Sequence, residues 1–219
     1  MSRGNICELF GYKKVRQNYR RKAQEDGNMK ITAINGSPRK NGRISKIVDE
    51  MIKGAEENGH KCEKIYLVDL NIKDCTGCMS CQEKGACVFR DDIEKIEEAI
   101  KISDLIIWAS PTHWANVSGL LLRVFERLFG FLIKEQPKRP PLKRNAKGKK
   151  AILVTACSTA RPFNWIYNQS RSCISRMHEI CKWSGQEISG TFVLPGSLTM
   201  KDIPEKYLKK AREVGRRIK

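Results

Sequence analysis

The feature that most constrains this fold is the regular alternation of short apolar runs with longer amphipathic stretches. The apolar runs have the length of buried strands, which we predict at residues 30–35, 61–69, 104–110, 151–156 and 186–194. The stretches between them predict helices at residues 44–58, 91–102, 118–130, 164–184 and 204–217. Strands and helices that alternate in this way indicate a parallel sheet covered by helices on both faces. The sequence therefore predicts an α/β fold.

One domain accounts for most of the chain. With 219 residues, the chain is long enough for one well-packed domain and short for two. We expect this domain to cover residues 29–219, because the first strand begins just after Met29. Residues 1–28 are a basic N-terminal extension, either an accessory helical arm or the result of a start assigned too far upstream. Residues 134–149 contain three prolines and are predicted to form a basic insertion without regular structure.

The positive charge of the chain is concentrated in a few segments. Residues 1–28, 133–150 and 201–219 together carry +16 of the formal net charge of +18, so the rest is nearly neutral. No zinc-finger, helix-turn-helix or RNP pattern accompanies this charge, and we expect no nucleic-acid partner. Two interpretations stay open: a solubilising surface, or the steering of anionic ligands and partners.

No segment resembles a membrane span or a secretory signal. The most apolar stretch, residues 120–133, is interrupted by Arg123, Glu126 and Arg127 and falls short of the roughly 18 uninterrupted apolar residues that a span needs. The first residues carry positive charge but no continuous apolar core. We therefore expect a cytoplasmic protein without a membrane partner.

A loop rich in glycine and hydroxyl groups, residues 35–45, joins the first strand to the first helix. Free backbone N–H groups and the helix dipole at such a position favour a phosphate. Ser37 and Ser45 offer hydroxyl groups, and Arg39 and Arg43 offer charge-assisted hydrogen bonds. The loop matches neither a Walker loop nor a G-x-G-x-x-G fingerprint, so an ordinary strand-to-helix turn stays open as the alternative to a phosphate site.

Two further loops follow strands at the same predicted edge, where open parallel sheets bind ligands. Residues 110–119 combine backbone amides with the flat side chains of His113 and Trp114, which suit a heteroaromatic ring or, alternatively, a packed capping turn. After the fourth strand, the small polar residues Cys157 and Ser158 provide a weaker candidate contact for the edge of such a ring.

Four of the nine cysteines fall within thirteen positions, at Cys75, Cys78, Cys81 and Cys87. Two consecutive gaps of two residues bring three thiolates around one centre, as in ferredoxin-type ligand runs. Structural zinc sites usually divide their ligands into two separated pairs. The spacing therefore favours a [4Fe–4S] cluster over zinc, and a loop of reduced thiols without any cluster stays open.

Three motifs, taken in order, resemble the NADPH-dependent FMN reductase and iron–sulfur flavoprotein family over residues 30–194. They are G-S-P-R-x-x-G from Gly36, C-x-G-C-x-x-C from Cys75 and S-P-x-x-W-x-x-x-S-G from Ser110. The resemblance implies a flavodoxin-like three-layer sandwich with a five-stranded parallel sheet of order 2-1-3-4-5. It also implies bound FMN and a homodimer or homotetramer.

The resemblance also implies where FMN binds. The candidate phosphate contacts are Ser37, Arg39, Arg43, Ile44 and Ser45. The resemblance places the flavin ring against Pro111, Thr112, His113 and Trp114, and the loops themselves add Asn116, Cys157 and Ser158 as candidate ring contacts. The chain departs from the family pattern in two places, with Ile44 where a hydroxyl is usual and His113 where Tyr is more common. The phosphate contact is accordingly expected to shift to Arg43 or Ser45.

These observations predict an FMN-dependent oxidoreductase. In the favoured hypothesis, electrons pass between NAD(P)H or a reduced carrier and an acceptor through a [4Fe–4S] cluster. FMN carries the chemistry, so no catalytic side chain is expected. Two alternatives stay open: a cluster-free NAD(P)H-dependent reductase of FMN or quinones, and a non-enzymatic electron carrier that exchanges electrons with ferredoxin.

Overall fold

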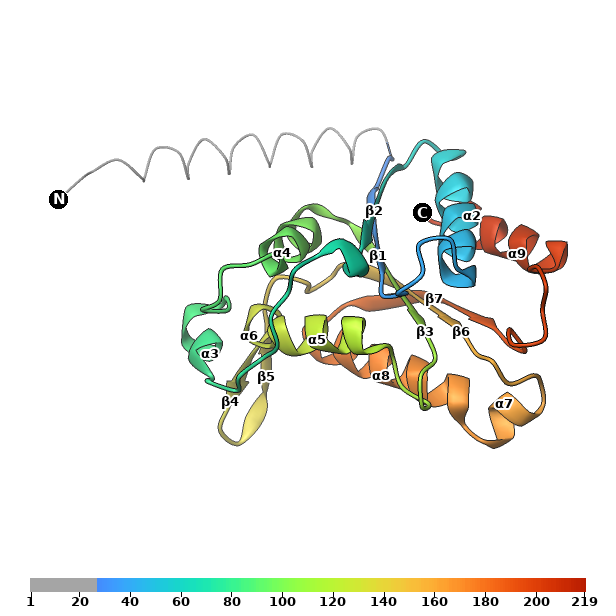
Figure 1. Cartoon of the computed structure of the whole chain (residues 1–219). Coiled ribbons are helices and arrows are strands. Elements are labelled where there is room, and N and C mark those ends of the chain that lie inside the picture. Colours follow the sequence, from blue (N-terminus) through green and yellow to red (C-terminus); the bar gives the residue numbers. More distant parts are fainter. Residues whose placement is uncertain (1–26) are drawn as a thin grey trace.

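The computed structural model describes residues 27–219 and contains a five-stranded parallel sheet at its centre (Figure 1). The strand order is β2-β1-β3-β6-β7, and every neighbouring pair is parallel. The strands are β1 (Lys30–Asn35), β2 (Lys61–Tyr66), β3 (Leu105–Pro111), β6 (Lys150–Ala156) and β7 (Glu187–Leu194). Counted within this sheet alone, the order is 2-1-3-4-5, which confirms the predicted flavodoxin-like arrangement.

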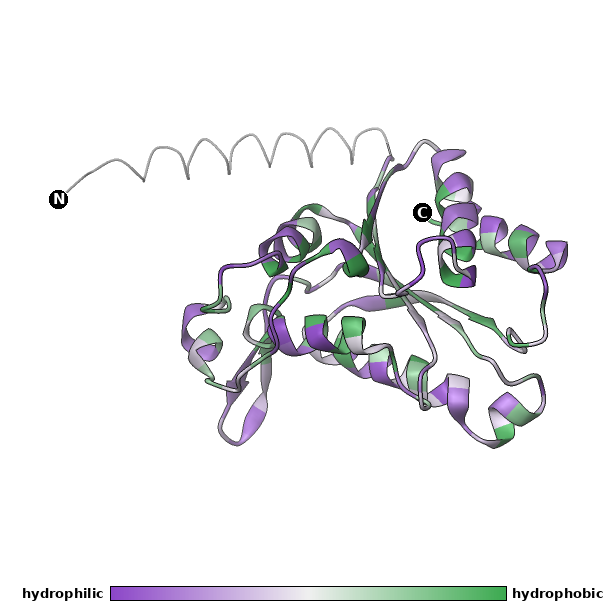
Figure 2. Ribbon diagram, viewed as in Figure 1, coloured by the Kyte–Doolittle hydropathy of each residue, from purple (hydrophilic) through white to green (hydrophobic). Residues whose placement is uncertain are grey.

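Helices cover both faces of the sheet and complete a three-layer sandwich (Figure 1). One face packs against α2 and α9, and the other packs against α4, α5 and α8. The helix bounds are α2 (Arg43–Glu56), α4 (Ile93–Ile102), α5 (Gly119–Arg127), α8 (Gln169–Ser184) and α9 (Glu205–Arg216). Figure 2 shows helices that alternate hydrophilic and hydrophobic residues around the sheet.

Strand β3 illustrates why these residues form a central parallel strand. Its first six residues are all buried. Ile106 and Trp108 point into the core under α4, α5 and α8, whereas Leu105 and Ile107 point into the core under α2 and α9. A strand buried on both faces needs a continuous apolar run. Strand β3 therefore lacks the alternation of apolar and polar residues that is typical of strands with one exposed face.

The predicted loop at residues 134–149 was wrong. Its first part forms an antiparallel hairpin of β4 (Ile133–Gln136) and β5 (Arg139–Lys143), and Figure 2 shows this hairpin as hydrophilic. Pro140 and Pro141 are tolerated because β5 pairs with β4 alone, and because both prolines fall where the pairing register shifts, between the Lys134–Leu142 and Gln136–Arg139 pairs. Prolines exclude a central strand, but they do not exclude a two-stranded hairpin.

Two predicted helices are divided, and one helix was not predicted. The stretch 164–184 contains α7 (Phe163–Ile166) and α8, separated at Asn168, whose φ is 54°. The stretch 118–130 divides at Leu128 into α5 and α6 (Phe129–Leu132). After β2, a 3₁₀ turn at Leu67–Asp69 leads into the cysteine-rich segment, which contains the short helix α3 (Ser80–Lys84).

The predicted basic extension at residues 1–28 lies almost wholly outside the described residues. Within residues 27–219, no helix is long and apolar enough to cross a bilayer.

Candidate functional site

The loop between β1 and α2 is held in shape by its own short side chains. Asn35 Oδ1 accepts the N–H of Ser37 at 2.9 Å, and Asn35 Nδ2 donates to Ser45 Oγ at 2.8 Å. Ser37 Oγ accepts the N–H of Arg39 at 3.2 Å. Ser37 and Ser45 are both buried, with 5% and 0% exposure. The sequence motif therefore folds into a rigid turn that leads directly into the helix.

The N-terminus of α2 is suited to an anion. Its cap residue, Gly42, has no side chain to accept a hydrogen bond, and the first turn of α2 contains no acidic residue. The first amides of a helix have no acceptor within the helix and carry a partial positive charge. Here they are the N–H groups of Arg43, Ile44 and Ser45, so Ile44 can contribute through its backbone although it lacks a hydroxyl.

Arg43 is engaged elsewhere. Its guanidinium donates to the carbonyl of Met200, in the loop that follows β7. A basic pocket of about 290 Å³ lies beside it, lined by Arg39, Asn41, Gly42, Arg43, Lys46, Lys201, Asp202 and Ile203. Sequence reasoning missed Lys201, because it follows the last strand and only the fold brings it beside the first loop.

The second loop forms a tight turn that projects from the end of β3. The backbones of His113 and Asn116 pair in both directions, at 2.9 and 2.8 Å. Between them, Trp114 and Ala115 have φ values of 49° and 59°. Positive φ at both central residues is the conformation of a type I′ hairpin turn. Trp114 is fully exposed at its tip, so its ring is not packed in the core.

Hydrogen bonds bring the first two loops together at one sheet edge. Ser118 Oγ donates to the carbonyl of Gly36 at 2.6 Å, and the Ser118 N–H donates to Ser110 Oγ at 2.8 Å. The Gly36 N–H donates to the carbonyl of Ala109 at 2.8 Å. The candidate phosphate loop and the candidate ring loop are therefore adjacent, as expected for the carboxyl ends of neighbouring parallel strands.

The third loop joins the same edge through its backbone. The Thr112 N–H donates to the carbonyl of Ala156 at 2.9 Å, which connects the ends of β3 and β6. Ser158 is exposed, whereas Cys157 is fully buried, with its thiol 3.4 Å from Gln169 Oε1. Of these two predicted ring contacts, only Ser158 presents its side chain at the surface.

An exposed apolar surface next to this edge was not predicted from the sequence. Helix α7 follows β6, and Phe163, Trp165 and Ile166 of this helix are 52%, 62% and 58% exposed. The C-cap residue, Tyr167, is 66% exposed. The run of aromatic residues is the available signal in the sequence, but a single helix over residues 164–184 does not place these residues on a separate exposed surface. Large exposed apolar patches of this kind mark interaction surfaces.

The cysteine-rich segment brings its four thiols to one pocket. Cys75, Cys78, Cys81 and Cys87 all line it. Cys75 and Cys78 are exposed, and Cys81 and Cys87 are half-buried. The other lining residues are mostly apolar and include Met79, Val88, Phe89 and Phe129. Within residues 27–219, however, no three His, Cys, Asp or Glu side chains are close enough to be recognised as a metal-binding group.

Local hydrogen bonds and burial give these thiols different acidities. The backbone and hydroxyl of Ser80 donate to Cys78 and lower the pKa of its thiol. Burial raises the pKa of Cys81, and the neighbouring charges of Cys87 and Cys75 raise it further.

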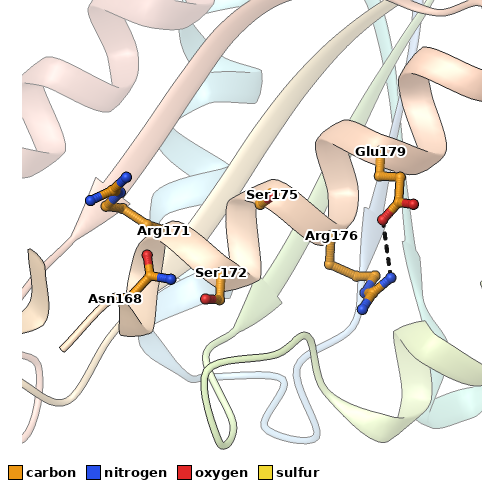
Figure 3. Close-up of a pocket in the computed structure, with 6 residues that line it drawn as sticks. All are labelled: Asn168, Arg171, Ser172, Ser175, Arg176 and Glu179. Atoms are coloured by element: carbon orange, nitrogen blue, oxygen red, sulfur yellow. Dashed lines mark hydrogen bonds and ion pairs between the residues drawn. The ribbon is translucent and has the colours of Figure 1, made fainter.

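A further pocket lies on α8 (Figure 3). Its lining consists of Asn168, Arg171, Ser172, Ser175, Arg176 and Glu179. All of them come from one helix or its cap, and Arg176 pairs with Glu179 at 3.1 Å. The lining contains no residue of the three loops.

Comparisons with known proteins agree with this geometry. The profile of the family described as NADPH-dependent FMN reductase matches residues 29–187. An iron–sulfur flavoprotein of Archaeoglobus fulgidus is 31% identical over 194 residues, which cover 87% of this chain and 79% of that protein. Another, from Clostridioides difficile, is 36% identical over 131 residues, which cover 57% of this chain and 58% of that protein.

Solved structures show the same fold at low identity. An NAD(P)H:quinone oxidoreductase from Methanothermobacter marburgensis has a TM-score of 0.72 and 15% identity, covering 87% of this chain and 98% of that one. An FMN-dependent NADH-azoreductase from Bacillus anthracis, solved with FMN, has a TM-score of 0.63 and 15% identity, covering 86% and 96%. With the family profile spanning most of the flavodoxin-like domain, this chain is an oxidoreductase that belongs to the NADPH-dependent FMN reductase family.

Proposed function

We propose that this chain binds FMN at the joined loops after β1, β3 and β6, and that it passes electrons between NAD(P)H and an acceptor through a [4Fe–4S] cluster on its four clustered cysteines. The single observation that carries the FMN site is the adjacency of the uncapped α2 N-terminus to the projecting 111–116 turn. One feature suits a phosphate and the other suits a planar ring, and both lie at the edge where this fold binds ligands.

The FMN phosphate would be held at the start of α2. The backbone N–H groups of Arg43, Ile44 and Ser45 supply donors, and Arg39 supplies charge. The buried Ser37 hydroxyl keeps the loop open to the ligand by bonding within the loop. Arg43 acts through its backbone, because its side chain is bonded to the carbonyl of Met200.

The flavin ring would lie along the 111–116 turn. Its contacts would come from Pro111, Thr112, His113, Trp114 and Asn116, with the backbone of Cys157 and the side chain of Ser158 at the ring edge. The exposed Trp114 supports this assignment, because a large aromatic side chain at a rigid turn offers a stacking surface at little entropic cost. No side chain is needed as a general base.

The four cysteines fit a cluster in kind and in number. All four line one pocket whose other walls are mostly apolar, with Cys81 and Cys87 half-buried and Cys75 and Cys78 exposed. When bound, FMN supplies two-electron chemistry with NAD(P)H, and a cubane cluster supplies one-electron transfer. The names of the Archaeoglobus and Clostridioides relatives support this assignment, which for this chain is a proposal.

One observation favours a second candidate function. The four thiols are not gathered into a metal-binding group in the described residues, which suits a cluster-free NAD(P)H-dependent reductase of FMN or quinones. In that case, the cysteine-rich segment would only cover the neighbouring core. A carrier that exchanges electrons with ferredoxin and never reacts with NAD(P)H is the remaining alternative.

Anaerobic purification followed by absorption, iron and acid-labile sulfide measurements tests the proposal. We expect flavin bands together with about four irons per chain. Mixing with NADPH in a stopped-flow instrument should bleach the flavin, which a ferredoxin-linked carrier would not show. A yellow protein without iron would support the cluster-free reductase. A colourless protein that does not take up added FMN would overturn the whole proposal.

We also propose that the chain forms a homodimer or homotetramer through α7. The exposed apolar residues of α7 lie next to the FMN loops, so a second copy placed there would both bury them and cover the flavin. Trp165→Ser should lower the molar mass measured by light scattering and weaken FMN binding. A wild-type protein that is monomeric at high concentration would contradict this arrangement.

A further inference from the structure

Arg127, the last residue of α5, is buried beneath the cysteine-rich segment. Its side chain has no exposed surface, although it carries a positive charge. A buried guanidinium is costly unless its charge is paired and its N–H groups are bonded. The hydrogen-bond acceptors of the Arg127 guanidinium therefore indicate the role of this residue.

All five guanidinium N–H donors have acceptors, and all of these acceptors belong to the segment from Lys73 to Asp91. Nη1 donates to the Lys73 carbonyl and to Asp91 Oδ2, both at 2.7 Å. Nη2 donates to the Phe89 carbonyl at 3.2 Å and to Asp91 Oδ1 at 3.1 Å. Nε donates to Cys87 Sγ at 3.2 Å. The planar fork thus joins the two ends of the segment that carries the four cysteines.

The bond to Cys87 differs from the others because its acceptor is one of the proposed cluster ligands. Asp91 balances the charge of Arg127 through two hydrogen bonds, and the Nε–H dipole remains directed at the sulfur. A hydrogen bond to a ligating sulfur stabilises the more negative, reduced form of a cluster and so raises its reduction potential.

We propose that Arg127 is a positioning residue that closes the 73–91 segment around the cluster and raises the reduction potential of the cluster through its Nε–H bond to Cys87. This inference rests on the proposed cluster. Arg127 follows Cys87 by 40 positions, so the ligand motif itself gives no sign of this residue.

A second arginine provides a matched control. Arg144, just after β5, donates to the carbonyls of Gly130, Cys81 and Gln82, the last at 2.9 Å. It therefore joins α3, through the carbonyls of Cys81 and Gln82, to α6, through the carbonyl of Gly130. Packing here is already close, since a Cβ on Gly130 would lie 2.4 Å from the Cys81 carbonyl oxygen. Arg144 shares the loop-holding role of Arg127 without its bond to a sulfur.

The test compares the full-length proteins Arg127→Lys and Arg144→Gln with wild type after anaerobic reconstitution with iron and sulfide. Lysine keeps the charge and loses the Nε–H donor. We expect both variants to load less iron. Only Arg127→Lys should shift the midpoint potential downward in an EPR-monitored redox titration. At the midpoint potential of the wild-type cluster, the ratio of reduced to oxidised cluster in Arg127→Lys should be about tenfold lower. This ratio corresponds to a midpoint potential about 59 mV lower for a one-electron couple.

A measurement on the wild-type fold covers the case in which Arg127→Lys does not fold. With ¹⁵N-arginine incorporated, pulsed EPR of the reduced cluster should detect coupling to one arginine nitrogen. If the wild-type protein shows no coupling to an arginine nitrogen, the inference is overturned. It is also overturned if Arg127→Lys carries the cluster and has the wild-type midpoint potential. Both outcomes leave the proposed function intact. A wild-type protein that loads no iron would instead remove the proposed cluster, and this inference with it.

Discussion

The loops after β1 and β3 hold themselves in shape, whereas the cysteine-rich segment after β2 is held by side chains from elsewhere in the chain. In the first region, Asn35, Ser37, Ser45 and Ser118 make short bonds within the sheet edge. In the second, the bonds come from Arg127 at the end of α5 and from Arg144 after β5. The candidate FMN site is formed by loops at the edge of the sheet, whereas the cysteine-rich segment depends on side chains from other elements.

Helix α5 connects the two regions. Its cap residue Ser118 bonds to the loop after β1, and its last residue, Arg127, bonds to the cysteine-rich segment. The helix has nine residues, which places its two ends about 14 Å apart. The two regions therefore lie at opposite ends of one short helix, and variants can test whether they act independently.

The largest expected effect separates the two regions completely. Cys78→Ser removes one thiolate from the proposed ligand set and should reduce cluster iron from about four per chain to near zero. FMN content should stay at the wild-type level, because no FMN loop depends on Cys78. Loss of FMN together with the iron would show that the two regions are not independent.

Cys62→Ser is the matched control for this variant. Cys62 lies in β2, outside the cysteine-rich segment, and burial together with the charge of Glu56 raises the pKa of its thiol to about 12. The variant should keep both iron and FMN. A loss of iron here would indicate that the iron is not confined to the four clustered cysteines.

A smaller effect is expected for Arg39→Glu, which tests the phosphate end of the FMN site. The side chain is exposed, so the free energy of unfolding should change little. Loss of a charge-assisted hydrogen bond costs about 1.5–3 kcal/mol, so the Kd for FMN should rise about 10- to 100-fold. Fluorescence titration measures the Kd for FMN. Riboflavin, which lacks the phosphate, serves as the control ligand. An equal loss of riboflavin affinity would contradict a phosphate at the start of α2.

The smallest effect is expected for Trp114→Ala at the ring end. Aromatic stacking contributes about 0.5–1.5 kcal/mol, so the Kd for FMN should rise about two- to tenfold. The melting temperature should not change, because this side chain is fully exposed in the turn. Here riboflavin should lose as much affinity as FMN. A large drop in melting temperature would instead assign Trp114 a packing role.

The sequence by itself determined the sheet, the family and the elements of the candidate site. Strand β3 is recognisable because a strand buried on both faces must be a continuous apolar run. The start of α2 is recognisable because glycine and serine residues precede it without an acidic residue. The cysteine spacing fixes which thiols share a pocket, because all four lie in one short segment.

Only the tertiary structure decided which distant residues complete these sites. Lys201 joins the basic pocket because the loop that follows β7 comes back to the start of α2, where Arg43 bonds to the Met200 carbonyl. Arg144 reaches α3 because the β4–β5 hairpin folds back onto the cysteine-rich segment. Arg127 appeared in the sequence only as an interruption of an apolar helix. Sequence patterns indicate how a residue packs within its own helix or strand. A long side chain such as that of arginine also contacts other elements, and those contacts depend on the tertiary structure. The burial of the Arg127 charge becomes intelligible only when its five acceptors are seen together.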